Sequence, residues 1–93
     1  MNIYEQAISL WGPQLQVAMF AEECSEAAAS SMRYLFRNMD RAGGLASEVA
    51  DVEIMCEQMR IVLGNEAVSA AKSAKLARLQ SRIDRAHSGE PKE

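Results

Sequence analysis

The chain has 93 residues, of which 48% are hydrophobic and 25% are charged, and its formal net charge is −3. This length fits one domain, and this composition is typical of a globular protein rather than a disordered or fibrous one. Ten basic against thirteen acidic side chains argue against binding of nucleic acid through a polybasic surface. A chain of this size buries only about 60–68% of its unfolded surface, so we expect a thin core and a homo-oligomer, either a dimer or a tetramer.

The amino terminus has no basic region ahead of an apolar run, and acidic residues interrupt every longer apolar stretch. We therefore expect neither a secretory signal nor a membrane span, and hence a cytoplasmic protein. Cys24 and Cys56 are the only cysteines and have no CxxC spacing. This favours reduced, partly buried thiols over a disulfide or a zinc site.

Four helices are predicted, and the first two lie on either side of a Gly-Pro break. Apolar residues at helical spacing follow Asn2 and end at Gly12 and Pro13. Pro13 suits the first position of a new helix, whose apolar pattern continues to about Asn38. Residues 39–44, which contain two adjacent glycines, are expected to form a short loop.

The third predicted helix begins near Leu45 or Ala46, and Gly64 ends it. Asn65 is then expected to cap a fourth helix that continues to about His87. This last segment is rich in Ala, Lys, Leu and Arg, which favour helices.

No run of alternating apolar and polar residues indicates a strand, so the predicted fold is all-α. We expect a four-helix bundle, completed by homo-oligomerisation, that forms a single domain over residues 1–87. Residues 88–93 contain a glycine and a proline without any apolar pattern and are expected to be a disordered tail.

Three glutamates, Glu22, Glu23 and Glu26, interrupt the apolar part of the second predicted helix. On a helical wheel Glu22 and Glu26 fall within about 20° of Leu15 and Met19, and Glu23 lies about 60° further round. None of the three has a lysine or arginine three or four residues away. Another group must therefore neutralise them.

The third predicted helix repeats this arrangement with Glu48 and Asp51, which align with Val52, Met55 and Met59 on one face. Two neighbouring helices of this kind would gather about four negative charges, which requires a divalent cation or strongly raised pKa values. Hard oxygen ligands favour Mg²⁺, with Mn²⁺ as the alternative. A solvated polar face is the competing interpretation for any single acid, but it explains the whole set poorly.

The acids lie in two ordered motifs: EECSE at residues 22–26 is followed, after 21 residues, by EVAD at residues 48–51. This arrangement resembles the EExxE and ExxD motifs of MazG-like, all-α nucleoside triphosphate pyrophosphohydrolases. The resemblance extends from Trp11 to about Ile83. It also includes Gln16, the stretch DVEIMCEQ at 51–58 and KLAR at 75–78.

The resemblance implies an enzyme that cleaves a nucleoside or deoxynucleoside triphosphate between the α and β phosphates, with Mg²⁺, to give a monophosphate and pyrophosphate. It implies that Glu23, Glu26, Glu48 and Asp51 are the metal ligands. Glu22 would orient its neighbours or help to position a water. A bound divalent ion neutralises phosphate charge and lowers the pKa of water, so this chemistry needs no side-chain nucleophile.

The fourth predicted helix carries a basic stripe that includes Lys72, Lys75 and Arg78. Residues 64–93 carry six basic and four acidic side chains, a net +2, whereas residues 1–63 carry four basic and nine acidic ones, a net −5. A solvated face that balances the acidic half is one interpretation of the stripe. The resemblance favours a phosphate-binding role for Lys75, with Lys72 as the competing candidate.

Two further residues could contact a substrate. Trp11, the only tryptophan, would either stack on a nucleobase or fill the packing between the first two helices. Gln16 lies within about 20° of Glu23 on the wheel, so its amide could read a base edge or hold a metal ligand. An exposed helix residue is the alternative for Gln16.

The function predicted from the sequence is thus a nucleotide pyrophosphohydrolase that removes surplus or non-standard nucleoside triphosphates. A non-catalytic helical module for oligomerisation or binding is the main alternative, and its acids would pair with a basic stripe on another subunit. The third possibility is an activity like that of phosphoribosyl-ATP pyrophosphohydrolase.

Overall fold

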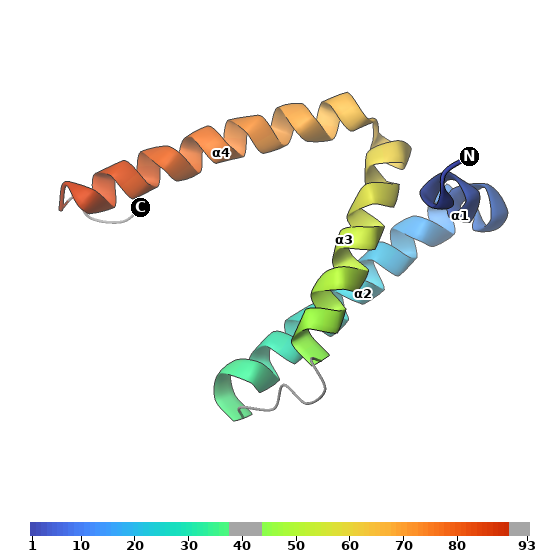
Figure 1. The fold of residues 1–93 in the computed structure, drawn as a ribbon, viewed down its shortest axis with the longest axis horizontal. Helices are drawn as coiled ribbons and strands as arrows, with labels where there is room; N and C mark the ends of the chain where they lie inside the picture. The colour runs from blue at the N-terminus through green and yellow to red at the C-terminus, as the bar shows by residue number, and fades with distance from the viewer. Residues whose placement is uncertain (38–43, 90–93) are drawn as a thin grey trace. The chain divides into compact units, whose positions relative to one another are not determined.

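The computed structural model describes residues 1–37 and 44–89, and these residues form four α-helices and no strand (Figure 1). The helices are α1 (Ile3–Trp11), α2 (Pro13–Arg37), α3 (Gly44–Leu63) and α4 (Asn65–His87). The all-α class is therefore confirmed, and each predicted boundary agrees to within one or two residues. The expected loop at 39–44 lies outside the described residues except for Gly44, which is already the first residue of α3 rather than part of a loop. Most of the expected tail also lies outside the described residues.

The chain divides into two compact units, Met1–Val62 and Leu63–Glu93. The first contains α1, α2 and nearly all of α3, and the second contains α4. The four-helix bundle and the single domain over 1–87 remain predictions. No helix among the described residues is long and apolar enough to cross a membrane.

The capping residues of α1 set the start of the chain's first helix. Asn2 Oδ1 accepts a hydrogen bond from the Glu5 backbone N–H at 2.8 Å, and the Asn2 N–H donates to Glu5 Oε1 at 2.9 Å. This reciprocal pair satisfies backbone donors that the first turn leaves without a partner. The helix ends at Gly12, where φ is +86°, and Pro13 opens α2. The predicted Gly-Pro break is confirmed.

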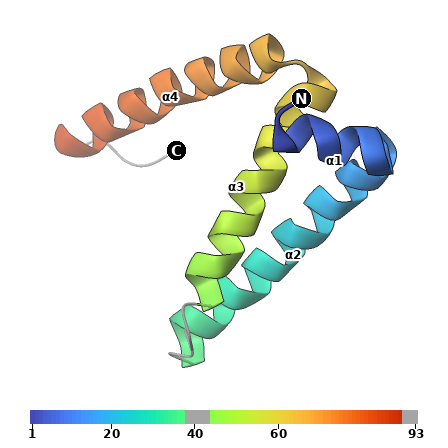
Figure 2. The ribbon, with the colours of Figure 1, turned by 45° about the vertical axis from the view of Figure 1, so that its right-hand side comes forward.

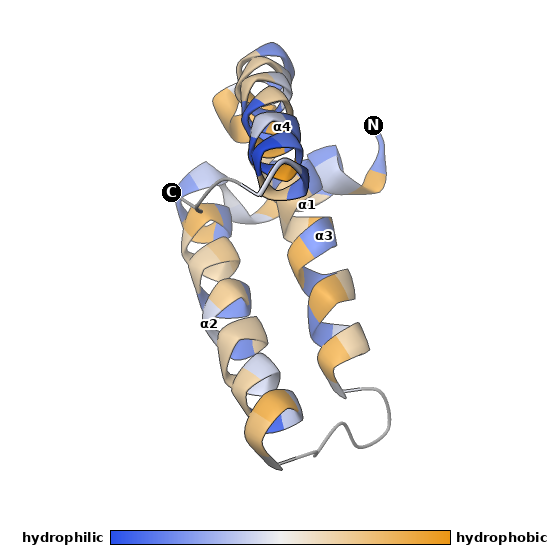
Figure 3. Ribbon diagram, turned by 90° about the vertical axis from the view of Figure 1, so that its left-hand side faces the viewer, coloured by the Kyte–Doolittle hydropathy of each residue, from blue (hydrophilic) through white to orange (hydrophobic). Residues whose placement is uncertain are grey.

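The helices α2 and α3 lie side by side and antiparallel, and α1 lies at the end of this pair where α2 begins (Figures 1 and 2). The thin core between them includes Met55 and Met59, each only 6% exposed. Three polar side chains, Gln16, Ser30 and Gln58, are also buried there. Many apolar side chains of both helices remain exposed. Hydrophobic residues recur along the length of both helices (Figure 3).

Two predictions about single residues are wrong. Asn65 does not cap α4, because Gly64 occupies the N-cap with φ at +101° and Asn65 is already helical. The thiol of Cys24 is half-buried as expected, but Cys56 is exposed. Cys56 lies one residue, and so about 100°, away from the buried Met55 on α3.

Candidate metal centre

The antiparallel packing of α2 and α3 brings chemically similar side chains together in layers. Gln16 donates a hydrogen bond to Gln58, Met19 and Met55 line one cavity, and Glu26 lies beside Glu48. Glu23 is close enough to Asp51 for that carboxylate to raise its pKa. The layers recur because a step of three or four residues along α2 is matched by the same step back along α3.

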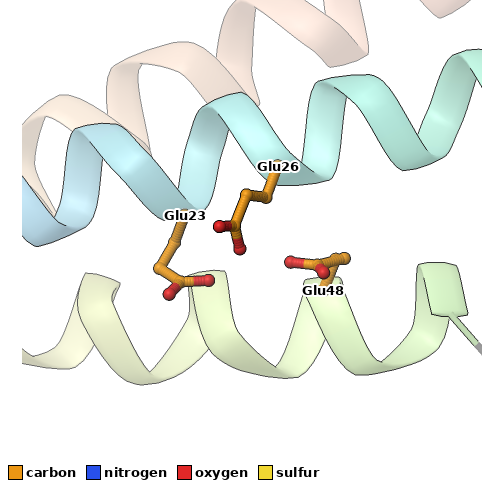
Figure 4. A group of neighbouring side chains, drawn as sticks. All are labelled: Glu23, Glu26 and Glu48. Carbon is orange, nitrogen blue, oxygen red and sulfur yellow. The ribbon is translucent and has the colours of Figure 1, made fainter.

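The acidic layers form a compact group of three glutamates. Glu23 and Glu26 extend from α2 and Glu48 extends from α3, and Figure 4 shows their carboxylates in the space between the two helices. One carboxylate oxygen from each of the three lies within 4.8 Å of the other two. The structure therefore brings together three of the four acids that were predicted to converge.

Two oxygens of this group are buried without a hydrogen-bond partner, Oε2 of Glu23 and Oε2 of Glu48. A buried carboxylate oxygen without a partner costs free energy, since its hydration is lost and nothing replaces it. The pKa of Glu23 is raised, first because burial disfavours its charged form and then because Glu26, Asp51, Glu48 and Glu22 repel its charge. Both features fit a site that takes a cation.

The remaining two predicted acids lie around this group. Asp51 is half-buried on α3, and its carboxylate is the second largest charge effect on the Glu23 pKa. Among the described residues the set of mutually close ligand atoms contains the three glutamates and not Asp51, which is therefore the outlying member of the four predicted ligands. Glu22 is exposed, and its effect on Glu23 is the smallest of the four.

Gln16 and Gln58 form a buried amide pair two helical turns away from the acids. They are 4% and 5% exposed, and Gln16 Nε2 donates to Gln58 Oε1. Gln58 Nε2 in turn donates to Met55 Sδ at 3.6 Å, and sulfur is a weak acceptor. The interpretation of Gln16 as an exposed residue is wrong, because its side chain faces α3.

Sequence reasoning gave Gln58 no role, although it lies within the stretch that carries the resemblance. Its spacing of seven residues from Asp51 and three from Met55 places all three on one face of α3. The sequence therefore predicts that Gln58 lies on the same face of α3 as Asp51 and Met55. Its partner on α2 was not predictable, because the register between two helices depends on their packing.

The amide pair forms part of a cavity of about 340 Å³ lined by Trp11, Leu15, Gln16, Met19, Met55 and Gln58. Trp11 is 58% exposed, so it does not fill the packing between α1 and α2. One of its surfaces lines this cavity instead. Its stacking on a base remains a prediction.

The predicted phosphate-binding residues Lys72, Lys75 and Arg78 are exposed on α4. Lys75 and Arg78, with Leu79 and Arg82, line a hollow of about 230 Å³ on this helix. The basic stripe is therefore present as a surface of the second unit. Its role toward a substrate remains a prediction.

The fold and the site together define an all-α chain with an acidic centre between two antiparallel helices. Comparison of the chain with models of protein families, with curated proteins and with solved structures gave no match.

Proposed function

We propose that this chain is a Mg²⁺-dependent nucleoside triphosphate pyrophosphohydrolase of the MazG-like kind. The observation that carries the proposal is the convergence of Glu23, Glu26 and Glu48, two of whose oxygens are buried without a partner. Carboxylate oxygens are the donors that Mg²⁺ and Mn²⁺ prefer, and a cation would relieve both the repulsion and the lost hydration. The three glutamates would hold the ion, with Asp51 as a fourth ligand.

Mg²⁺, when bound, supplies positive charge to the triphosphate and lowers the pKa of a coordinated water. In the proposed reaction the oxygen of a water attacks the α phosphorus, and the bond from that phosphorus to the oxygen bridging it to the β phosphorus breaks. The products are a nucleoside monophosphate and pyrophosphate, and the protons of the water pass to solvent or to a carboxylate. No residue of the chain forms a covalent bond to the substrate.

The chain's own residues have separate tasks in this proposal. Glu23, Glu26, Glu48 and Asp51 concentrate negative charge between two helices and so fix where the cation and the phosphates bind. Glu22, which is exposed beside Glu23, orients the attacking water. Lys72, Lys75 and Arg78 bind phosphate oxygens through their positive charge.

The test is direct hydrolysis. The purified chain is incubated with a panel of ribo- and deoxynucleoside triphosphates and Mg²⁺, and the products are separated by chromatography. We expect equal amounts of monophosphate and pyrophosphate from at least one triphosphate, and no turnover in EDTA. Release of a nucleoside diphosphate and orthophosphate would place the cleavage between the β and γ phosphates and overturn the proposal.

The two alternative functions give different results in the same assay. A non-catalytic module releases no pyrophosphate from any substrate. An activity like that of phosphoribosyl-ATP pyrophosphohydrolase appears only when the phosphoribosyl nucleotide is added, and competition between it and the simple triphosphates ranks the two substrates.

A further inference from the structure

The cavity beside the acidic centre has the chemistry of a site for a planar heterocycle. Its volume is about 340 Å³, and its lining contains the indole of Trp11 with Leu15, Met19 and Met55. Apolar and aromatic side chains of this kind bury the faces of a flat ring, and small-molecule sites typically add a few polar groups that fix its orientation. Among the described lining residues, the amides of Gln16 and Gln58 supply such groups, beside the indole N–H of Trp11.

The amide pair is built into the wall of the cavity. Both side chains are more than nine-tenths buried and are joined by a hydrogen bond, so the packing of α2 against α3 holds them in place. An amide has two N–H donors and a carbonyl acceptor, which is more capacity than the bond between the two amides and the weak bond from Gln58 Nε2 to Met55 Sδ use. A buried pair of this kind is costly unless its remaining capacity is met, by the protein or by a ligand.

The position of the cavity matches the proposed substrate. Gln16 precedes Glu23 by seven residues on α2, and Gln58 follows Asp51 by seven residues on α3. Seven residues of helix span about 10 Å. A pentose and its first phosphate bridge a separation of this order, so a base in the cavity places the phosphates at the acids.

On the basis of the proposed function, we propose that Gln16 and Gln58 read the hydrogen-bonding edge of the nucleobase that this cavity holds. A base edge presents either a ring N–H beside a carbonyl, as in uracil and guanine, or a ring nitrogen beside an amino group, as in cytosine and adenine. If both amides turn over, the bond between them forms again with donor and acceptor exchanged. The pair therefore accommodates either kind of edge, and its role is to require an edge that forms hydrogen bonds.

Trp11 gives a readout of this site that depends on neither hydrolysis nor metal. It is the only tryptophan of the chain and lines the cavity. Titration of the metal-free protein with adenosine, guanosine, cytidine and uridine is expected to change its fluorescence to saturation for at least one nucleoside. The probe is then the tightest-binding nucleoside and its edge-blocked analogue: N6,N6-dimethyladenosine, 1-methylguanosine, N4,N4-dimethylcytidine or 3-methyluridine.

In the wild type the blocked analogue is expected to bind about threefold to tenfold more weakly for each hydrogen bond that it loses. The double variant Gln16→Met, Gln58→Met keeps the volume and removes both partners together, which leaves no unpaired amide. In this variant the blocked analogue is expected to bind with an affinity within about twofold of that of the unblocked nucleoside. The matched control is Gln14→Met, which replaces an exposed glutamine of α2. This variant should discriminate against the blocked analogue as strongly as the wild type does.

The outcomes separate this inference from the proposed function. If the double variant still binds the blocked analogue as much more weakly as the wild type does, blocking acts by steric clash, and the role of the amides is overturned. Absence of a saturable signal with every nucleoside would overturn the base site even if triphosphates are hydrolysed. Saturable binding with the expected loss of discrimination, but without pyrophosphate release, supports the amide pair and removes the proposed reaction alone.

Discussion

At the scale of residues, the acidic centre predicts separate effects on turnover and on stability. Each of Glu23→Gln, Glu26→Gln, Glu48→Gln and Asp51→Asn is expected to lower turnover on the order of 100-fold or more, because charge placed to bind the cation and phosphates is lost. In EDTA the same variants should melt no lower than the wild type, since removing one of several like charges relieves repulsion. Turnover with Mg²⁺ and circular dichroism melting without it test the two effects.

The matched control is Glu53→Gln, which removes an exposed carboxylate from α3 outside the group of three. We expect wild-type turnover from this variant. Full activity in all four variants of the centre would contradict the assignment of the metal ligands. Turnover lost equally in Glu53→Gln would point to the net charge of the chain rather than to a defined centre.

The raised pKa of Glu23 predicts how the stability of the metal-free protein depends on pH. In the folded chain the Glu23 carboxyl keeps its proton to a higher pH than in the unfolded chain, where its pKa is near the ordinary 4.5. The folded state therefore binds more protons between those two values, and its stability falls as pH rises through them. At a pH below both pKa values Glu23 is protonated in both states, so it no longer destabilises the folded chain.

We expect the melting temperature of the wild type in EDTA to fall relative to that of Glu23→Gln as the pH is raised from about 4 to 7. The comparison cancels the titration of groups that the two proteins share. A difference that stays constant over this range would mean that the charge of Glu23 is not destabilising in the folded chain.

At the scale of elements, the turn between α1 and α2 depends on one backbone conformation. Gly12 has φ +86° and ψ 153°, a region that side chains with a Cβ rarely adopt, although a Cβ there would meet no atom within 4 Å. The cost of Gly12→Ala therefore comes from the backbone and is expected to be about 1–3 kcal/mol. Urea denaturation measures this loss, and Ser9→Ala in the exposed part of α1 should change stability by less than about 0.5 kcal/mol.

The elements themselves were predictable because they depend on local signals. Gly12-Pro13 and Gly64 marked two boundaries, and the 3.6-residue pattern gave the helices between them. The start of α4 was less certain, since Asn65 is a good capping residue but Gly64 permits the positive φ of this turn. Local preference alone did not decide between two neighbouring residues.

The candidate site was predictable in part, for a reason that concerns pairs of elements. The unpaired acids on an apolar face indicated that α2 and α3 approach each other there. The wheel could not show that Gln16 meets Gln58, or that Asp51 lies outside the closest group, because both depend on the register between the helices. A helix pattern specifies a face, whereas packing specifies the partner.

At the scale of the whole molecule, exposed apolar side chains predict a homo-oligomer. Near the end of α2, Leu35 is 67% and Phe36 is 74% exposed, and Leu63 at the end of α3 is 64% exposed. Covering side chains of this size is favourable at about 25 cal/mol per Å² of apolar surface. Light scattering at micromolar concentration should give a mass of at least twice the 10.2 kDa of one chain. A mass of one chain would contradict the prediction.

Metal binding should appear in the stability of the whole molecule. An ion that binds only the folded chain stabilises it by about 2.7 kcal/mol when the concentration of the free ion is a hundred times its dissociation constant. Because the ion would meet two buried oxygens without partners and relieve the repulsion at Glu23, we expect Mg²⁺ and Mn²⁺ to raise the melting temperature. Ca²⁺ accepts six to eight ligands in looser geometry, so it should stabilise the fold but support little turnover.

Thermal scans in EDTA and with each cation, run beside the hydrolysis assay, test this separation of stabilisation from turnover. In Glu23→Gln the rise in melting temperature caused by the cation should be smaller than in the wild type. No shift with any cation in the wild type would leave the acids without a partner and favour the non-catalytic module.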